Sequence, residues 1–157
     1  MSKSVGANSK LNLEEALKLD SQMCFALYSA SLSMGKVYQK LLKPLGLTYP
    51  QYLVMLILWE HGDSSVSELG EKLFLDSGTL TPLLKRMEQA GFLARTRDPE
   101  DERRVIVSLT AEGKGLRKQA IKIPPQIFQA TSCSVPEARS ILKELKTLQK
   151  ALAQHHQ

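Results

Sequence analysis

The sequence predicts a mainly α-helical protein that carries one small β-hairpin. Apolar residues recur at intervals of three and four along several segments, which is typical of amphipathic helices. Only residues 92–109 alternate apolar and polar side chains, in two short runs around a charged turn, and this pattern indicates a β-hairpin. A length of 157 residues suits one domain with a hydrophobic core. We expect a flexible N-terminus over residues 1–12 and a single domain over residues 13–157.

The composition favours a polyanionic partner. Lys and Arg number 21 against 16 Asp and Glu, which leaves a net charge of +5, and such a basic excess is typical of proteins that bind nucleic acid. There is no apolar run of about 18 residues or more, and the first residues, MSKSVGANSK, are polar, so we expect a cytoplasmic protein without a membrane partner. Two cysteines do not make a secreted disulfide framework, so a bridge between Cys24 and Cys133 would be conditional.

The first two predicted helices differ in how apolar their faces are. Apolar residues spaced by three and four over residues 13–41 predict one long amphipathic helix, which ends before Lys43 and Pro44. After the turn PLGLTYPQ, residues 51–61 are apolar on nearly every side. A helix of that kind belongs in the core.

The next segment predicts two helices joined by a tight connection. Ser65 and Glu68 have the spacing of a capping box, so a short helix begins there and ends near residue 75. Asp76 or Ser77 caps the second helix, which stops at Gly91, a natural left-handed position. Pro82 removes one backbone hydrogen bond and should loosen or bend the first turns of this helix.

The hairpin and the C-terminal helices complete the prediction. The strands are expected at 92–97 and 104–109, around the charged turn DPEDER. Thr110 begins another helix, which Pro124 and Pro125 interrupt, and the capping box Ser134 to Glu137 opens a final helix. The apolar residues of this last helix form a near-heptad stripe that favours pairing with another helix. They are Ala138, Ile141, Leu142, Leu145, Leu148 and Leu152.

Helix, turn, helix and charged hairpin, in that order over residues 51–110, predict a winged helix-turn-helix that binds double-stranded DNA. Short hydroxyl side chains near the start of the second helix, basic residues later in it, and arginines at the hairpin tip all suit DNA. These predicted contacts are Ser77, Thr79, Thr81, Lys85, Arg86, Arg103 and Arg104. Two other interpretations stand beside this one: the hydroxyls cap the helix, and the charges of the DERR turn pair with one another. The preceding helix pair and the basic residues after the hairpin favour DNA binding.

One motif resembles a known family. The run DPEDERRVIVSLTAEG resembles the wing signature of the MarR family of dimeric winged-helix repressors, with Asp101, Arg103, Leu109 and Thr110 in the matching places. The resemblance extends over about residues 13–152. It implies a homodimer built by the first and last helices, residues 13–45 and 111–153, and a pseudo-palindromic operator.

Further segments resemble one subgroup, the organic hydroperoxide resistance regulators (OhrR). The matching features are LDSQMCFALYSAS, LFLDSGTLTPLLKRMEQAGF and the spacing of Cys24, Tyr38 and Tyr49. This resemblance implies that an organic hydroperoxide is the inducer and that Cys24 is the peroxide sensor. In the two-cysteine version it implies that the sulfenic acid of Cys24 condenses with Cys133 of the partner subunit and that DNA is then released. It implies no enzymatic activity and no cofactor.

Helix geometry limits which tyrosines can support the thiol. The sensing species is the thiolate, which hydrogen-bond donors such as tyrosine hydroxyls can stabilise. Tyr28 lies four residues after Cys24 on the same helical face, whereas Tyr38 is fourteen residues on, roughly 21 Å along a helix that rises ~1.5 Å per residue. Tyr38 therefore reaches Cys24 only from an antiparallel partner helix, and Tyr49 closes the same pocket. Apolar neighbours suit an alkyl hydroperoxide: Met23, Phe25, Leu27 and Met34.

Cys133 lies in the segment TSCSVP, between the proline interruption and the last helix, where a loop can move without unfolding the core. A disulfide needs Cα atoms about 4.4 to 6.8 Å apart, so a longer reduced distance would force the loop to move and the DNA-binding parts to tilt. Bridge formation would thus be coupled to DNA release.

Other interpretations compete with redox sensing. Cys24 can be a packing residue, Cys133 incidental, and each tyrosine an ordinary core aromatic. A MarR-like repressor released by a small aromatic ligand needs neither cysteine. A thiol peroxidase needs a cation near its thiol, and residues 19–35 contain no Arg, Lys or His. A metal sensor lacks a ligand set of sensible spacing, because His61 is isolated and His155 and His156 lie in the tail.

Overall fold

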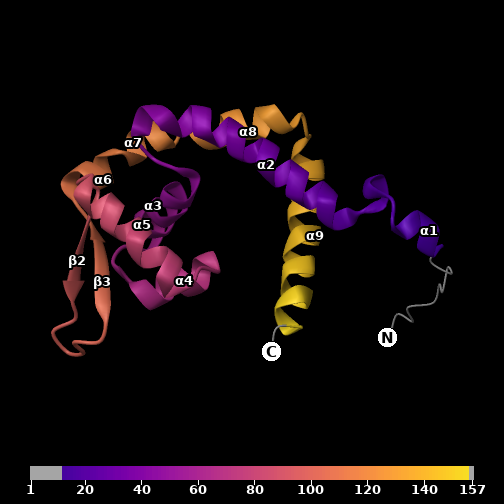
Figure 1. The fold of residues 1–157 in the computed structure, drawn as a ribbon. Helices are drawn as coiled ribbons and strands as arrows, with labels where there is room; N and C mark the ends of the chain where they lie inside the picture. Colours follow the sequence, from indigo (N-terminus) through magenta and orange to yellow (C-terminus); the bar gives the residue numbers. More distant parts are fainter. Residues whose placement is uncertain (1–11, 156–157) are drawn as a thin grey trace. The chain divides into compact units, whose positions relative to one another are not determined.

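The computed structural model describes residues 12–155, so the N-terminus predicted to be flexible lies almost wholly outside the described residues. The chain separates into two compact units, of which the first ends at Val37 and the second begins at Tyr38. Each unit is considered by itself, and the single domain over residues 13–157 stays a prediction. The mainly helical fold with a small antiparallel sheet is confirmed (Figure 1).

The prediction of one helix over residues 13–41 is wrong. The chain forms α1 (Leu13–Ala16), a 3-10 turn η1 (Leu19–Ser21) and α2 (Met23–Leu42). Lys18 and Gln22 have extended backbones, with ψ of 138° and 108°, and the side-chain amide of Gln22 donates to the carbonyls of Ala16 and Lys18. The Ala16 carbonyl ends α1 and the Lys18 carbonyl begins η1, so one glutamine side chain joins the two sides of the break. The consequence is that Cys24 lies in the first turn of α2.

A tight connection leads into the core helix. The 3-10 turn η2 (Lys43–Leu45) ends at a left-handed Gly46, and α3 (Tyr49–His61) begins at a capping box between Thr48 and Gln51. This start is two residues earlier than predicted, because the threonine hydroxyl binds the Gln51 N–H. Its buried residues are Tyr52, Val54, Met55 and Leu58. The predicted core position of this helix is confirmed.

The two helices that follow match the sequence prediction. The α4 helix (Val66–Leu73) begins at the Ser65 to Glu68 capping box, and α5 (Ser77–Gln89) is capped by the Asp76 side chain. Gly91, with φ of 85°, follows α5 in the left-handed region that glycine adopts without strain. Pro82 lies inside α5, and the helix continues through it.

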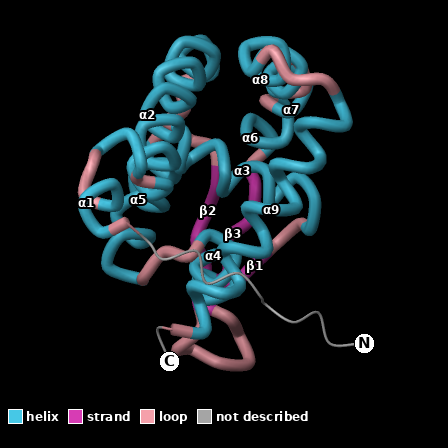
Figure 2. Tube along the Cα trace, turned by 90° about the vertical axis from the view of Figure 1, so that its right-hand side faces the viewer, coloured by secondary structure: helices cyan, strands magenta, loops and turns pink. Residues whose placement is uncertain are grey.

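The sheet has one strand more than the sequence predicts. The predicted hairpin is present as β2 (Leu93–Arg97) and β3 (Val105–Leu109), which pair antiparallel from Leu93 with Leu109 to Arg97 with Val105. A two-residue strand, β1 (Ser64–Ser65), adds to the other side of β3, for an order of β1-β3-β2. Figures 1 and 2 show β2 and β3 side by side, and Figure 2 shows α4 close to β1. We call the hairpin of residues 93–109 the wing.

The C-terminal part is more continuously helical than predicted. Thr110 caps α6 (Ala111–Gly115), which α7 (Arg117–Ala120), α8 (Ile123–Thr131) and α9 (Val135–Gln154) follow. The prolines at 124 and 125 do not interrupt a helix. They occupy the first turn of α8, where a missing N–H has no intrahelical acceptor to lose. The predicted capping box that opens the last helix is confirmed at Ser134.

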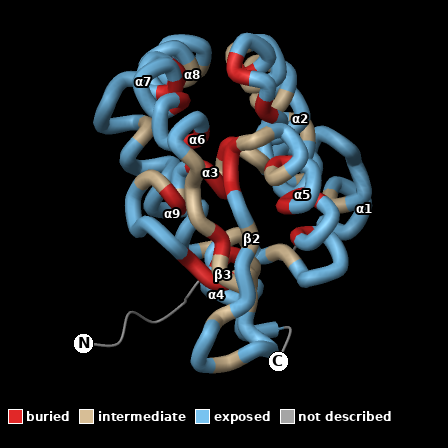
Figure 3. Tube along the Cα trace, turned by 90° about the vertical axis from the view of Figure 1, so that its left-hand side faces the viewer, coloured by how far each residue is buried: buried red, intermediate tan, exposed pale blue. Residues whose placement is uncertain are grey.

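The core lies in the second unit. Buried apolar residues come mainly from α3, α4, α5, the strands and α7, and Figure 3 shows α3 and α5 carrying them. No described residue of α9 is buried, and its apolar stripe is exposed at Ile141, Leu142 and Leu145. Among residues 12–155, no single helix is long and apolar enough to cross a membrane, and only the bent pair Met23–Leu45 with α3 together has that length and composition.

Candidate DNA interface and thiol site

The start of α5 presents free hydroxyl groups. Asp76 Oδ1 accepts the Thr79 N–H at 2.8 Å, so the aspartate caps the helix. Ser77, Thr79 and Thr81 are exposed, and within the described part of the chain their hydroxyls make no hydrogen bond. The interpretation that these hydroxyls serve as caps therefore does not apply. Further along α5, Lys85 and Arg86 are exposed as well.

The two arginines predicted at the wing tip have different surroundings. Arg103 has a side chain 93% exposed, and its Nε lies 3.3 Å from Asp101 Oδ1. Arg104 is 46% exposed and lies between two carboxylates, 3.3 Å from Glu68 and 3.5 Å from Asp98. Arg103 thus pairs within the DERR turn while staying almost fully exposed, whereas both carboxylates beside Arg104 lie outside these four residues.

A second ion pair joins the wing to α5. The backbone N–H of Arg95 donates to Glu88 Oε1 at 2.9 Å, and the guanidinium binds Oε2 through Nε and Nη2 at 3.2 and 2.9 Å. The backbone hydrogen bond first, and then the side-chain hydrogen bond of Arg95, lower the pKa of Glu88. Arg95 therefore holds the wing on α5 and is not a free arginine of the surface.

Cys24 is an exposed free thiol in the first turn of α2. The backbone N–H groups of a first turn have no intrahelical acceptor, and the helix dipole makes this end favourable for an anion. Tyr28, one turn later, is 61% exposed. Within its own chain the thiol is not a buried packing residue.

Three tyrosines of the second unit form an aromatic cluster. The ring centroids of Tyr38 and Tyr49 are 4.4 Å apart, and Tyr52 lies 5.8 Å from Tyr38 and 6.5 Å from Tyr49. Burial, followed by the neighbouring Tyr49 and Tyr52 hydroxyls, raises the pKa of Tyr38 to about 12. Burial also raises the pKa values of Tyr49 and Tyr52. All three hydroxyls therefore stay protonated and can donate hydrogen bonds. Sequence reasoning missed Tyr52, although its position three residues after Tyr49 places both on one helical face.

Cys133 lies in a very short connection between α8 and α9. Ser132 has a left-handed backbone with φ of 54°, and Ser134 is already the cap of α9. The backbone N–H of Cys133 donates to Thr131 Oγ1 at 3.3 Å, and its half-buried thiol donates to the Thr131 carbonyl at 3.6 Å. The sequence predicted a longer loop after a proline interruption, and the helix α8 takes its place. Both cysteines are free thiols.

Comparison with known proteins shows to which family the chain belongs. Residues 36–120 match the family described as transcriptional regulator SarA/Rot. The organic hydroperoxide resistance transcriptional regulator of Bacillus subtilis is 47% identical over 143 residues, which are 91% of this chain and 97% of that protein. The chain belongs to the MarR-type winged-helix regulators.

Solved structures of AbfR of Staphylococcus epidermidis are similar as well. Reduced AbfR bound to DNA is 37% identical with a TM-score of 0.72, over 90% of this chain and 99% of that one. Disulfide-formed AbfR is 37% identical with a TM-score of 0.61, over 90% and 96%. Because these relatives are transcriptional regulators, the prediction of a regulator, and not an enzyme, is confirmed.

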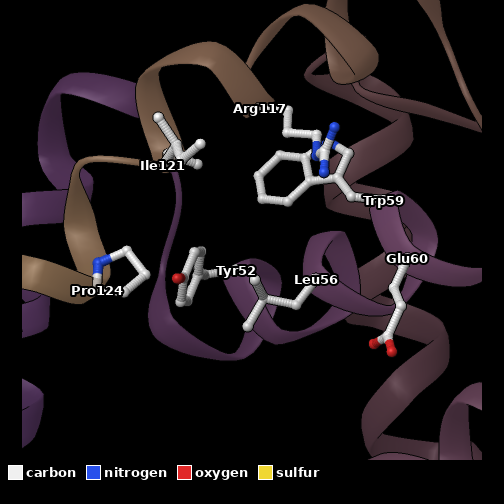
Figure 4. Close-up of a pocket in the computed structure, with 8 residues that line it drawn as sticks. Tyr52, Leu56, Trp59, Glu60, Arg117, Ile121 and Pro124 are labelled. Atoms are coloured by element: carbon white, nitrogen blue, oxygen red, sulfur yellow. The ribbon is translucent and has the colours of Figure 1, made fainter.

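This MarR-type regulator also contains a pocket that the sequence did not indicate. Its volume is about 410 Å³, and it lies between α3 and the segment of α7 and α8 (Figure 4). Its lining includes Tyr52, Leu56, Trp59, Arg117, Ile121 and Pro124. Arg117 and Glu60 also line the pocket, so one positive and one negative side chain stand among otherwise apolar and aromatic ones (Figure 4). The Trp59 indole N–H donates to the carbonyl of Gly113 at 3.0 Å.

The described residues contain no cluster of side chains that could form a metal centre. Among residues 12–155, no group of three or more His, Cys, Asp or Glu side chains is placed to hold an ion. His61 lies next to Glu60, and His156 lies outside the described residues. The absence of a metal cofactor stays a prediction.

Proposed function

We propose that this regulator is a DNA-binding repressor that senses organic hydroperoxides through Cys24. The observation that carries the proposal is the exposed thiol in the first turn of α2. The similarity to the Bacillus subtilis organic hydroperoxide regulator supports it. A DNA-binding regulator acts where the DNA is, so a cytoplasmic location stays our expectation.

DNA contacts come from α5 and the wing. The exposed hydroxyls of Ser77, Thr79 and Thr81 meet phosphates or base edges at the helix N-terminus, and Lys85 and Arg86 follow them. Arg103 projects from the wing tip toward the adjacent minor groove. In a homodimer two such sets read the two halves of a pseudo-palindromic site.

Sensing begins with attack of the Cys24 thiolate on a peroxide oxygen. The O–O bond breaks, an S–O bond forms, and the alcohol leaves, so the sulfur is oxidised by two electrons and the peroxide is reduced. Exposed apolar side chains next to the thiol favour a substrate with an alkyl group. They are Met23, Phe25 and Leu27.

The tyrosine hydroxyls support this step from across the dimer. Tyr38 lies fourteen residues after Cys24, which corresponds to roughly 21 Å along a helix that rises ~1.5 Å per residue, so we expect Tyr38 not to reach the thiol of its own subunit. An antiparallel α2 of the partner subunit brings Tyr38 and Tyr49 to Cys24. Their raised pKa values keep both hydroxyls as donors to the thiolate and to the leaving oxygen.

Cys133 of the partner subunit resolves the sulfenic acid. Its sulfur attacks the sulfur of Cys24, a disulfide forms and water leaves. Since Cys133 lies between two helices with only Ser132 and Ser134 beside it, the bridge cannot form by moving a slack loop. Disulfide formation therefore displaces α8 or α9, and this displacement tilts the DNA-binding parts.

A covalent dimer is the expected product of oxidation. We expect an alkyl hydroperoxide to convert the full chain to a dimer on a non-reducing gel, which dithiothreitol reverses, because both sulfurs of the bridge come from different subunits. The dimer should be absent in Cys24→Ser and in Cys133→Ser. A dimer that persists in Cys133→Ser would remove Cys133 from the mechanism, since only Cys24 then remains to form it.

The wing tip should dominate the affinity for DNA. We expect Arg103→Ala to weaken binding to a duplex selected from random sequence by about tenfold or more, because a side chain that reaches a groove contributes ~1–3 kcal/mol. Fluorescence anisotropy measures the dissociation constant. The matched control is Lys143→Ala on α9, which removes the same charge elsewhere. Equal losses in both variants would show a general effect of charge and would contradict a wing contact.

A second candidate function is release by a small aromatic acid. The pocket of about 410 Å³ favours it, since Tyr52 and Trp59 can hold an aromatic ring while Arg117 binds a carboxylate. In that case the cysteines are incidental. If hydroperoxide still abolished DNA binding in the Cys24→Ser variant, Cys24 would not be the sensor, and this second function would be favoured over the first.

A further inference from the structure

Arg104 connects both arms of the wing with α4. It lies just before β3, and its Nη1 is 3.5 Å from Asp98 Oδ2, on the arm that follows β2. Its carbonyl accepts the Asp98 N–H at 2.8 Å. Its Nη2 lies 3.3 Å from Glu68 Oε1, in the first turn of α4. One guanidinium thus bridges two carboxylates from separate elements.

The carboxylate of Glu68 is itself held in place. Oε2 accepts the Ser65 N–H at 2.7 Å, and the Glu68 N–H donates to Ser65 Oγ at 3.1 Å. Ser65 pairs with Ile106 in the sheet. The hydrogen bonds from Ser65 first, and then Arg104, lower the pKa of Glu68, so the group stays ionised. Arg104 therefore binds an acceptor that is fixed to both α4 and β1.

We propose that Arg104 is a positioning residue: through Glu68 and Asp98 it holds the wing against α4, so that Arg103 is aimed at DNA. The proposal rests on the DNA binding proposed above. A short hairpin is mobile by itself, and ordering it only on binding would lower the affinity. The exposure of the two side chains supports a DNA contact for Arg103 and a positioning role for Arg104, since Arg103 is 93% and Arg104 46% exposed.

Removing the charge of Glu68 should change the DNA affinity in opposite directions for a positioning role of Arg104 and for a direct DNA contact. Glu68→Gln removes a negative charge beside the DNA-binding face and breaks the ion pair of Arg104 with α4, while the contact of Arg104 with Asp98 stays. If Arg104 only contacted phosphate, this change would strengthen DNA binding. If Arg104 positions the wing, the loss of its anchor weakens binding. Glutamine keeps a carbonyl oxygen for the Ser65 N–H, so the capping box survives the change.

We expect Glu68→Gln to weaken binding to the selected duplex roughly three- to tenfold, the size of a lost contact between coupled groups. The control is Glu71→Gln, which removes the same charge from an exposed position of α4 and should leave binding unchanged or slightly tighter. Circular dichroism and thermal unfolding check that both variants fold. Tighter binding by Glu68→Gln would overturn the proposal.

The salt dependence of the DNA affinity is a second measurement, and it changes only when a side chain that contacts phosphate is lost. Arg104→Gln should weaken binding without changing the slope of log K against log salt concentration, whereas Arg103→Gln lowers that slope by about one. The double variant Glu68→Gln with Arg104→Gln should bind as Arg104→Gln alone does, because without the arginine the Glu68 side chain has no contact with the wing left to lose. A lower slope in Arg104→Gln would overturn the positioning role. If Arg103→Gln left both the affinity and the slope unchanged, that result would contradict the DNA contact of Arg103 in the proposed function.

Discussion

DNA binding by Cys24→Ser is expected to be indifferent to organic hydroperoxide, whereas the unsubstituted protein should lose affinity for its duplex at least about tenfold, a typical coupling between two sites. The reason is that the serine hydroxyl is not an anion at neutral pH and cannot attack the peroxide O–O bond. Cys24 is exposed and makes no side-chain hydrogen bond within residues 12–155, so the substitution should leave the fold intact. Anisotropy titrations before and after treatment with cumene hydroperoxide measure the effect.

The control for this prediction is Cys133→Ser. If Cys133 acts after Cys24, this variant should still form a sulfenic acid, which a dimedone-type reagent traps, but no covalent dimer. Mass spectrometry of the trapped adduct locates it on the residue 24 peptide. Release of DNA by hydroperoxide in Cys24→Ser would contradict thiol sensing and would point to the aromatic pocket around Trp59.

Gly113→Ala is expected to lower the free energy of unfolding by about 2 to 4 kcal/mol, as overpacking against a backbone does. A Cβ at this position would lie 2.0 Å from the carbonyl oxygen of Phe92 and 3.1 Å from a methyl of Leu109. The backbone at Phe92 cannot shift easily, because its carbonyl accepts the Thr110 N–H at 3.1 Å. Alanine normally stabilises a helix relative to glycine, but at this position the close packing makes the substitution destabilising.

Gly115→Ala is the matched control for this prediction. Both glycines belong to α6, but a Cβ at Gly115 meets no atom within 4 Å. Its stability should be unchanged or slightly higher, by up to about 1 kcal/mol. Urea unfolding followed by the fluorescence of Trp59, the one tryptophan of the chain, compares the two variants. Equal midpoints would contradict the close approach of α6 to Phe92.

Capping boxes predicted two of the helix starts correctly. The Ser65 to Glu68 and Ser134 to Glu137 boxes each begin a helix, because a capping box satisfies orphan N–H groups within a few residues. The wing was predicted to within one residue at each strand, since its alternation reflects one buried and one exposed face. Interactions that need only neighbouring residues are visible in sequence.

Longer-range contacts decided what local patterns could not. The break before α2 depends on the Gln22 side chain reaching back to Ala16, which no periodicity reveals. The two-residue strand β1 exists only because β3 offers it a partner at Val107 and Ile106. Prolines at 124 and 125 end a helix or begin one according to the chain that precedes them.

The sequence by itself determined the winged-helix class, the capped helices, the hairpin and the two cysteines that set the redox hypothesis. Only the tertiary structure decided which side chains are available. Arg103 and Arg104 are neighbours of one type in sequence, yet a carboxylate 36 residues away from Arg104 gives the two side chains different surroundings. Likewise, Tyr52 joins Tyr38 and Tyr49 because the folded chain brings these three rings together within the second unit. Exposure and ion pairing arise from residues distant in the chain, so the folded structure alone specifies them.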